Sequence, residues 1–133
     1  MFKLQGIDHL NIDVNNIDES VSFYKKYFGF EVMRDYRYES KGKDVHFVLL
    51  GNKGKAYLCL YESADKVIDH TSSPFSHIGF HVANYKEALE VAKKDALLDE
   101  RYGEKEYEHS HSFYIIDPNG MGIEVSQVFG GGH

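Results

Sequence analysis

Cysteine, long apolar runs and clusters of basic residues are all scarce in this sequence, and each scarcity excludes a class of protein. Cys59 is the only cysteine, so no intrachain disulfide can form and a reducing compartment is the natural setting. No basic run is longer than two residues and the formal net charge is -6, which argues against a nucleic-acid partner and a polybasic membrane patch. No apolar stretch approaches the length of a membrane span, and Asp8 lies where a signal peptide needs apolar residues. We therefore expect a cytoplasmic protein that binds neither nucleic acid nor membrane.

The sequence does contain an internal repeat. The segment that begins at His9, HLNIDVNNIDESVSFYKK, aligns without a gap with the segment that begins at His77, HIGFHVANYKEALEVAKK. Val14 then matches Val82, and a pair of lysines ends both segments. Both copies have the pattern of a strand followed by a helix. The 133 residues are long enough for one domain, or for two fused halves, with a real core.

Hydrophobic periodicity predicts the elements of the first copy. Alternating apolar residues predict a strand over 7–14, with His9 and Asn11 on the face opposite to Ile12. A helix should follow from Asp18, as its cap, to about residue 28, and Gly29 should end it in a left-handed conformation. The apolar stripe of this helix consists of Val21, Tyr24, Tyr27 and Phe28.

The second copy predicts a strand from His77 and a helix over 85–94, whose apolar side consists of Ala88, Leu89, Val91 and Ala92. Three strand-like segments follow each helix, over 31–38, 45–50 and 56–61, and over 99–102, 112–116 and 122–127. We therefore predict an α+β fold of tandem βαβββ modules, forming a curved mixed sheet with helices on one face and a concave cavity on the other. The first module would span 1–62, a linker 63–76, the second module 77–128 and a loose tail 129–133.

The alternation also predicts a metal site. Glu124 lies between the apolar Ile123 and Val125, so it should share the cavity face with His9 and His77. Two imidazoles and one carboxylate make a three-ligand set with open coordination positions, which suits Fe(II), Mn(II) and catalytic Zn(II). A histidine in a strand is more commonly a structural residue, so this prediction depends on the coincidence of two repeat-equivalent histidines with a glutamate in phase.

Three segments, IDHLNIDV, FYKKYFGFEV and SFYIIDPNGMGIEV, resemble the vicinal oxygen chelate superfamily, which comprises glyoxalases, bleomycin-resistance proteins and dioxygenases. The resemblance places His9, His77 and Glu124 on the metal ligands of that family. It implies an enzyme that chelates a small substrate through two neighbouring oxygens on a divalent metal ion (Fe, Mn, Ni, Co or Zn). It also implies a homodimer with sites shared between chains.

The branch of the family is left open. Glyoxalases have a fourth ligand, a glutamate on the last strand of the first half, where this sequence has YLCLYE and no carboxylate in phase. Cys59 is either a thiolate ligand, a neighbour of the substrate or a small buried hydrophobe, and Glu62 should fall on the opposite face. The segments AYLCLYE and HSFYIIDPNG resemble fosfomycin-resistance thiol transferases, but EKEYEHSHS is acidic where those enzymes have a basic phosphonate pocket. Extradiol dioxygenases place a tyrosine where Tyr114 lies, yet most of them are longer.

Further residues are candidates for the cavity. Tyr114 is either a hydrogen-bond donor to a bound oxygen or a packed sheet residue, and His81 is a possible general base or partner of a metal ligand. The pocket wall should include Asn11, His46, Tyr57 and Cys59. Lyase, dioxygenase and thiol-transfer chemistry all remain possible. The alternatives are a non-catalytic protein that binds a planar drug or metabolite in a dimer groove, and a structural dimer with a relic ligand set.

Overall fold

A computed structural model of the chain describes residues 1–133 with the exception of 2, 5–6, 54–56, 64–66 and 129–133. It divides into two compact units, Met1–Ile68 and Asp69–His133, which are described separately below. The boundary lies inside the predicted linker 63–76, and the predicted tail lies outside the described residues. None of the described helices is long and apolar enough to cross a membrane.

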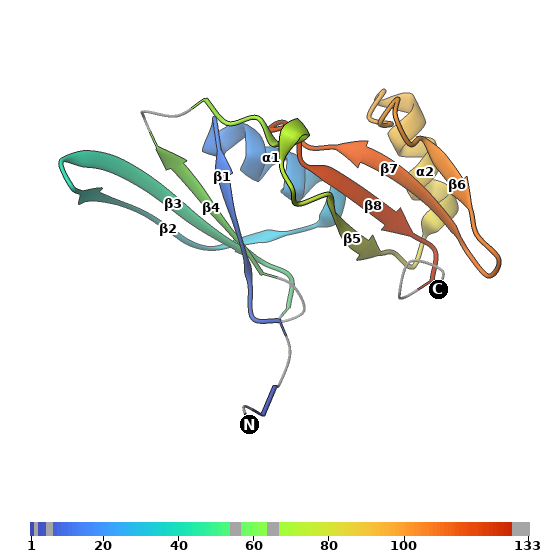
Figure 1. The fold of residues 1–133 in the computed structure, drawn as a ribbon, viewed down its shortest axis with the longest axis horizontal. Coiled ribbons are helices and arrows are strands. Elements are labelled where there is room, and N and C mark those ends of the chain that lie inside the picture. The colour runs from blue at the N-terminus through green and yellow to red at the C-terminus, as the bar shows by residue number, and fades with distance from the viewer. Residues whose placement is uncertain (2, 5–6, 54–56, 64–66, 129–133) are drawn as a thin grey trace. The chain divides into compact units, whose positions relative to one another are not determined.

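The first unit contains β1 (Leu10–Val14), α1 (Ile17–Phe28), β2 (Glu31–Ser40), β3 (Lys43–Gly51) and β4 (Tyr57–Ser63). Its strands form one sheet in the order β1-β4-β3-β2, in which β1 is parallel to β4 and the other pairs are antiparallel. Figure 1 shows α1 behind this sheet.

The second unit contains a 3-10 helix (His70–Ser72), β5 (His77–His81), α2 (Tyr85–Lys94), β6 (Glu104–Glu106), β7 (His111–Ile116) and β8 (Gly122–Ser126). Its sheet has the corresponding order β5-β8-β7-β6, again with a parallel first pair. The α+β class and the βαβββ order of both halves are therefore confirmed.

Helix α1 begins two residues earlier than predicted. Its cap is Asn16, whose side-chain oxygen accepts the backbone N–H of Glu19 at 2.9 Å; the predicted cap, Asp18, lies inside the first turn. Gly29 ends the helix with φ of 66°, in the left-handed conformation that glycine adopts without steric cost.

Two predicted strands were placed wrongly. The first strand begins at Leu10 rather than at residue 7, and Ile7 is exposed. Residues 99–102 form a turn instead of a strand, because the Asp99 carboxylate accepts the backbone N–H of Arg101 at 2.9 Å. Such local side-chain bonds compete with strand pairing, and β6 forms only after this turn.

The core of the first unit lies between α1 and the sheet. Val48, Leu50, Leu58 and Leu60 are buried on the inner face, and burial of each such side chain contributes roughly 1.5–3 kcal/mol. The buried face of α1 consists of Ile17, Ser20, Phe23 and Tyr24, so only Tyr24 of the predicted stripe is fully buried. In the second unit Phe113, Ile115, Ile123 and Val125 are buried, whereas Val91 of α2 is exposed, contrary to the prediction.

Candidate metal centre

His77, Glu124 and Tyr114 meet on one face of the second sheet. Glu124 pairs with Gly79 of β5 on one side and with Tyr114 of β7 on the other. The His77 Nε2 atom lies 3.1 Å from Glu124 Oε2, and the His77 and Tyr114 rings meet edge to face at 5.5 Å between centroids. Because Ile123 is fully buried on the opposite face, the period of two along β8 directs Glu124 away from the core.

The second oxygen of this carboxylate accepts no hydrogen bond from the described residues. Glu124 is only 8% exposed, and its Oε1 atom is buried without a hydrogen bond to any described residue. An unsatisfied buried carboxylate oxygen is costly, and a bound cation removes that cost. The face is open beside it, since a side chain at Gly79 would meet no atom within 4 Å. An imidazole nitrogen and a carboxylate oxygen next to open space fit a divalent metal ion.

Tyr114 is buried and held by a second tyrosine. The hydroxyl oxygens of Tyr114 and Tyr107 are 3.0 Å apart, and the Tyr102 ring packs against Tyr114 at 5.3 Å. Burial, the bond with Tyr107 and the Glu124 carboxylate all raise the pKa of Tyr114 above its usual value. Tyr114 therefore stays protonated at neutral pH and keeps a proton to donate. Tyr107, which the sequence analysis missed, lies in the β6–β7 loop, where its backbone N–H bonds to Ser110.

His81 lies at the end of β5, four residues after His77 and so on the same face of the strand. It pairs with Ser126 and its side chain is exposed. The structure thus places His81 at the opposite end of β5 from His77, on the face that carries the His77–Glu124 pair.

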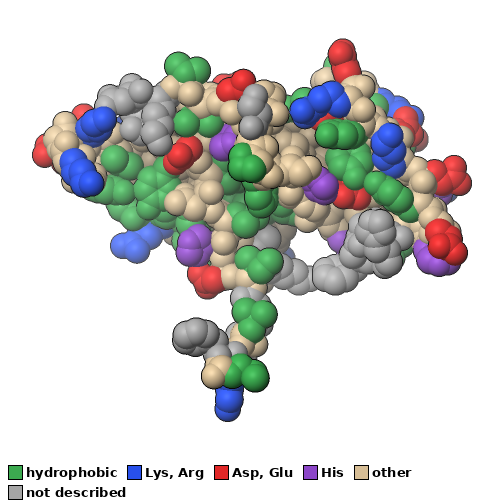
Figure 2. All heavy atoms as spheres, viewed as in Figure 1, with side chains coloured by type: hydrophobic (Ala, Val, Ile, Leu, Met, Phe, Trp, Pro, Cys, Tyr) green, Lys and Arg blue, Asp and Glu red, His purple; other side chains and the backbone are tan. Residues whose placement is uncertain are grey.

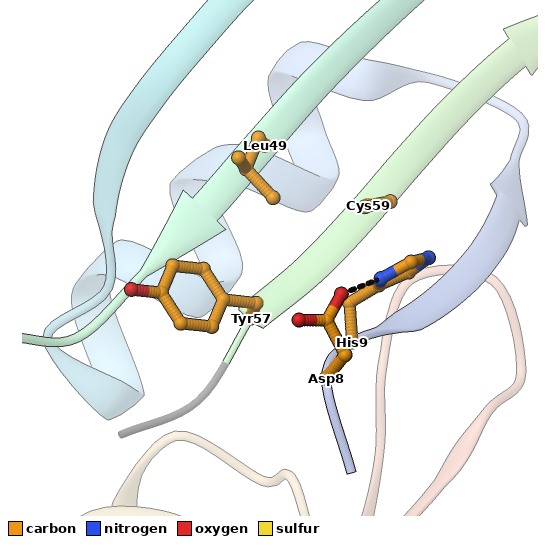
Figure 3. Close-up of a pocket in the computed structure, with 5 residues that line it drawn as sticks. All are labelled: Asp8, His9, Leu49, Tyr57 and Cys59. Carbon is orange, nitrogen blue, oxygen red and sulfur yellow. Dashed lines mark hydrogen bonds and ion pairs between the residues drawn. The ribbon is translucent and has the colours of Figure 1, made fainter. Parts of the chain in front are cut away.

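A pocket of about 260 Å³ in the first unit is lined by Asp8, His9, Leu49, Tyr57 and Cys59 (Figure 3). His9 directly precedes β1, and its Nδ1 atom lies 2.6 Å from Asp8 Oδ2. Nε2 is then the ring nitrogen that does not contact Asp8. A histidine whose other nitrogen contacts a carboxylate in this way is common at metal sites. Burial and the nearby Asp8 charge raise the pKa of the Cys59 thiol. Asp8 was missed, although its position next to His9 in the sequence was a signal.

Asn11 and His46 lie on opposite faces of the first sheet. Asn11 pairs with Cys59 in register and shares its face, whereas His46 pairs with Glu62. The His46 Nε2 atom contacts Asp35 Oδ1 at 2.7 Å, and His46 lines a separate pocket of about 250 Å³ together with Arg37 and Glu62. The structure thus brings His9, Tyr57 and Cys59 together but separates His46 from them.

Glu62 also lies on the inner face, as expected, and has a structural role. Its Oε2 atom accepts the backbone N–H of Ile17, the first residue of α1, at 2.6 Å. Among the described residues, no three histidine, cysteine or acidic side chains form a group that holds a metal ion. His9 belongs to the first unit, whereas His77 and Glu124 belong to the second.

An aromatic row lies beside the His9 pocket, on the same face of the first sheet. Its rings belong to Tyr36, Phe47 and Tyr61 on three neighbouring strands, with centroids 4.8 Å apart in each adjacent pair, and Tyr38 stacks on Tyr36. Figure 2 shows hydrophobic side chains gathered over this part of the sheet. Burial and a hydrogen bond with Tyr38 raise the pKa of Tyr61 to about 12.

Comparison with known proteins gives a family. Residues 6–125 match the profile of the Glyoxalase/Bleomycin resistance protein/Dioxygenase superfamily. A glyoxalase family protein from Bacillus cereus has the same fold, with a TM-score of 0.74 at 18% identity, over 94% of this chain and 95% of that one. The trypanothione-dependent glyoxalase I of Leishmania major has a TM-score of 0.70 at 20% identity, over 92% and 86% of the two chains. The fosfomycin resistance protein FosX of Listeria monocytogenes, solved with Mn(II) and sulfate, has a TM-score of 0.67 at 18% identity, over 98% of each chain.

Proposed function

The chain belongs to the glyoxalase/bleomycin resistance protein/dioxygenase superfamily, and we propose that it is a metal-dependent enzyme that chelates a small substrate through two neighbouring oxygens. The observation that supports this most directly is the His77–Glu124 pair, whose buried Oε1 atom has no partner among the described residues. We propose His9 as the third ligand, since it is the repeat equivalent of His77 and already pairs with Asp8. The ion would be Fe, Mn, Ni, Co or Zn.

The proposed chemistry follows from the groups around this pair. A metal bound there would act as a Lewis acid that stabilises negative charge on chelated oxygens. Tyr114, which stays protonated, would donate a hydrogen bond to a substrate oxygen. His81, on the same face, would serve as a general base or would orient a ligand. Tyr57 and Cys59, together with Asn11 on the same face, would form the wall of the substrate pocket.

These roles serve lyase, dioxygenase and thiol-transfer reactions equally, because each begins from a chelated substrate. Glyoxalase I and FosX, both of this fold, illustrate how the same architecture accompanies different activities. We further propose a cytoplasmic homodimer whose sites are shared between chains. Mixing His9→Ala with His77→Ala subunits tests the sharing, because regained metal binding requires ligands from two chains.

The first test is metal analysis of anaerobically purified, untagged protein. We expect about one tightly held ion per chain, with loss in His77→Ala and Glu124→Gln. His111→Ala and Glu106→Gln change exposed residues of the same sheet and should keep the metal. Iron would direct the assay to catechol-type substrates, and nickel, zinc or manganese to hemithioacetals, epoxides and thiol additions. Wild-type protein that takes up none of the five ions would refute the proposal.

The aromatic row favours a second candidate, a non-catalytic protein that binds a planar hydrophobic molecule. Tyr36 and Tyr38 are each 38% exposed, so their rings can still stack on a ligand. This function needs no metal. Binding of a planar dye to metal-free protein, abolished by Tyr36→Ser but unchanged in Glu124→Gln, would favour it over the enzyme.

A further inference from the structure

A buried histidine of the first unit has a ring nitrogen without a hydrogen bond. His46 of β3 is only 6% exposed, and its Nε2 atom lies 2.7 Å from Asp35 Oδ1. A carboxylate can only accept hydrogen bonds, so Nε2 is the donor of this contact. In the neutral ring Nδ1 then holds a lone pair, and this buried atom has no partner among the described residues. Because a buried acceptor without a donor is costly, Nδ1 is placed to accept a hydrogen bond from a ligand.

The pocket beside His46 is built by three neighbouring strands. Arg37 of β2 pairs with His46, and His46 pairs with Glu62 of β4, so these residues form a row across one face of the sheet. Asp44, two residues before His46, shares this face. The four residues line the pocket of about 250 Å³, towards the turn of the β2–β3 hairpin (Figure 1). This face is opposite to the one that carries the His9 pocket, so the two pockets are separate.

The charges around this pocket are mostly negative. The half-buried Glu62 uses its Oε2 atom to accept the Ile17 N–H, and a carboxylate accepts at both oxygens, so Oε1 can take a further bond. Asp44 lies exposed at the rim. Together with Asp35, which contacts His46, these residues supply three carboxylates against the single guanidinium of Arg37. A positively charged ligand is therefore favoured over an anion.

We infer that this pocket binds a small primary alkylamine in its ammonium form. The ammonium group has three N–H donors, which match His46 Nδ1 and the carboxylates of Glu62 and Asp44. No three described histidine, cysteine or acidic side chains form a group that holds a metal ion, whereas an ammonium ion binds through hydrogen bonds of about 2.7–2.9 Å. Val45 also lines the pocket and offers an apolar contact to the alkyl chain. The site does not depend on the metal-dependent function proposed above.

Titration with butylammonium chloride, followed by NMR of protein with nitrogen-15 in its histidine rings, tests the inference. We expect millimolar butylammonium to shift the Nδ1 resonance of His46 in a saturable way, and butanol, which has the same chain length but no charge, to bind much more weakly. His46→Phe keeps a planar ring but removes the acceptor, so it should weaken binding about tenfold or more. Arg37→Gln removes a positive charge and should strengthen binding. His109→Phe, at an exposed position of the second unit, is the matched control and should leave binding unchanged.

Three results would overturn the inference. The first is a His46 resonance that does not respond to butylammonium, or responds equally to butanol. The second is weaker binding in Arg37→Gln, because it would show that the guanidinium holds the ligand. The third is loss of binding in Glu124→Gln, because it would place the amine at the proposed metal centre instead. Circular dichroism checks the folding of His46→Phe, and if that variant does not fold, the wild-type titration and the exposed position Arg37 decide the question.

Discussion

Replacement of Glu62 by glutamine should destabilise the protein without affecting its metal content. Glu62 belongs to the same strand as Cys59, but its Oε2 atom accepts the first backbone N–H of α1 at 2.6 Å. A hydrogen bond to a charged acceptor contributes roughly 1.5–3 kcal/mol, against about 0.5–1.5 kcal/mol for a neutral one. Glutamine keeps an acceptor at this position but loses the negative charge that complements the helix N-terminus. The expected loss is therefore about 1 kcal/mol.

Urea unfolding followed by circular dichroism measures this loss. With a slope of about 2 kcal/mol per molar urea, the midpoint should fall by about 0.5 M. Glu39→Gln, an exposed position on β2 of the same sheet, is the matched control and should stay within about 0.5 kcal/mol of wild type. Metal analysis of the same preparations should give equal metal per chain in all three proteins. A Glu62→Gln protein of unchanged stability that has lost its metal would refute the reasoning and make Glu62 a ligand.

The remaining predictions concern a helix cap and an ion pair formed by a buried carboxylate. Asn16→Ala removes the acceptor of the Glu19 N–H and should lower the free energy of unfolding by about 1 kcal/mol. The Asn84 side chain makes no cap bond, so Asn84→Ala should change this free energy by less than about 0.5 kcal/mol. Equal urea midpoints for the two variants would contradict this prediction. Hydrogen bonds from Arg101 hold the pKa of Asp99 below its usual value. The pair therefore stabilises the native state at pH values above the unfolded-state pKa of about 3.9. This stabilisation is lost as the pH falls through the lower pKa of the native state. Asp99→Asn should therefore show a smaller drop in Tm than wild type between about pH 5 and about pH 3, and an equal drop would count against the pair.

Much of the fold was predictable because the repeat and the turn residues are local signals. The strands predicted over 31–38 and 45–50 leave room for a turn between them, and there Lys41 and Gly42 have positive φ, 51° and 74°, as a tight two-residue hairpin requires. The lengths of β2 and β3 were underestimated, since pairing continues to Ser40 and Lys43 at the turn itself. Residues 99–102 were misassigned because the turn depends on a bond between a side chain and the backbone, which hydrophobic periodicity does not detect.

The candidate site was predictable where alternation is clear. Ile123 and Val125 flank Glu124 with apolar side chains, and this pattern alone placed its carboxylate on the outer face. The strand that contains His46 reads VHFVLL, with apolar residues on both faces, so its phase could not be inferred. The register of strand pairing then decides on which face of the sheet His46 lies, because a shift of one residue moves a side chain to the other face. Tyr107 gave no signal, since the loop geometry that brings it to Tyr114 has no sequence motif.

The two halves of the repeat share the order of their strands but not their side-chain chemistry. Glu124 and Cys59, which correspond by strand pairing, lie closer together in the sequence than the matched histidines His77 and His9. The second half is therefore slightly shorter between its helix and its last strand. An alignment of the two halves at one constant offset consequently does not match Glu124 with Cys59. Pairing does not depend on loop length, because each parallel partner is fixed by hydrogen bonds to the first strand of its own module. Equivalent positions in such a repeat are thus defined by the register of the sheet, and by that measure a thiol in one unit stands where the other has a carboxylate.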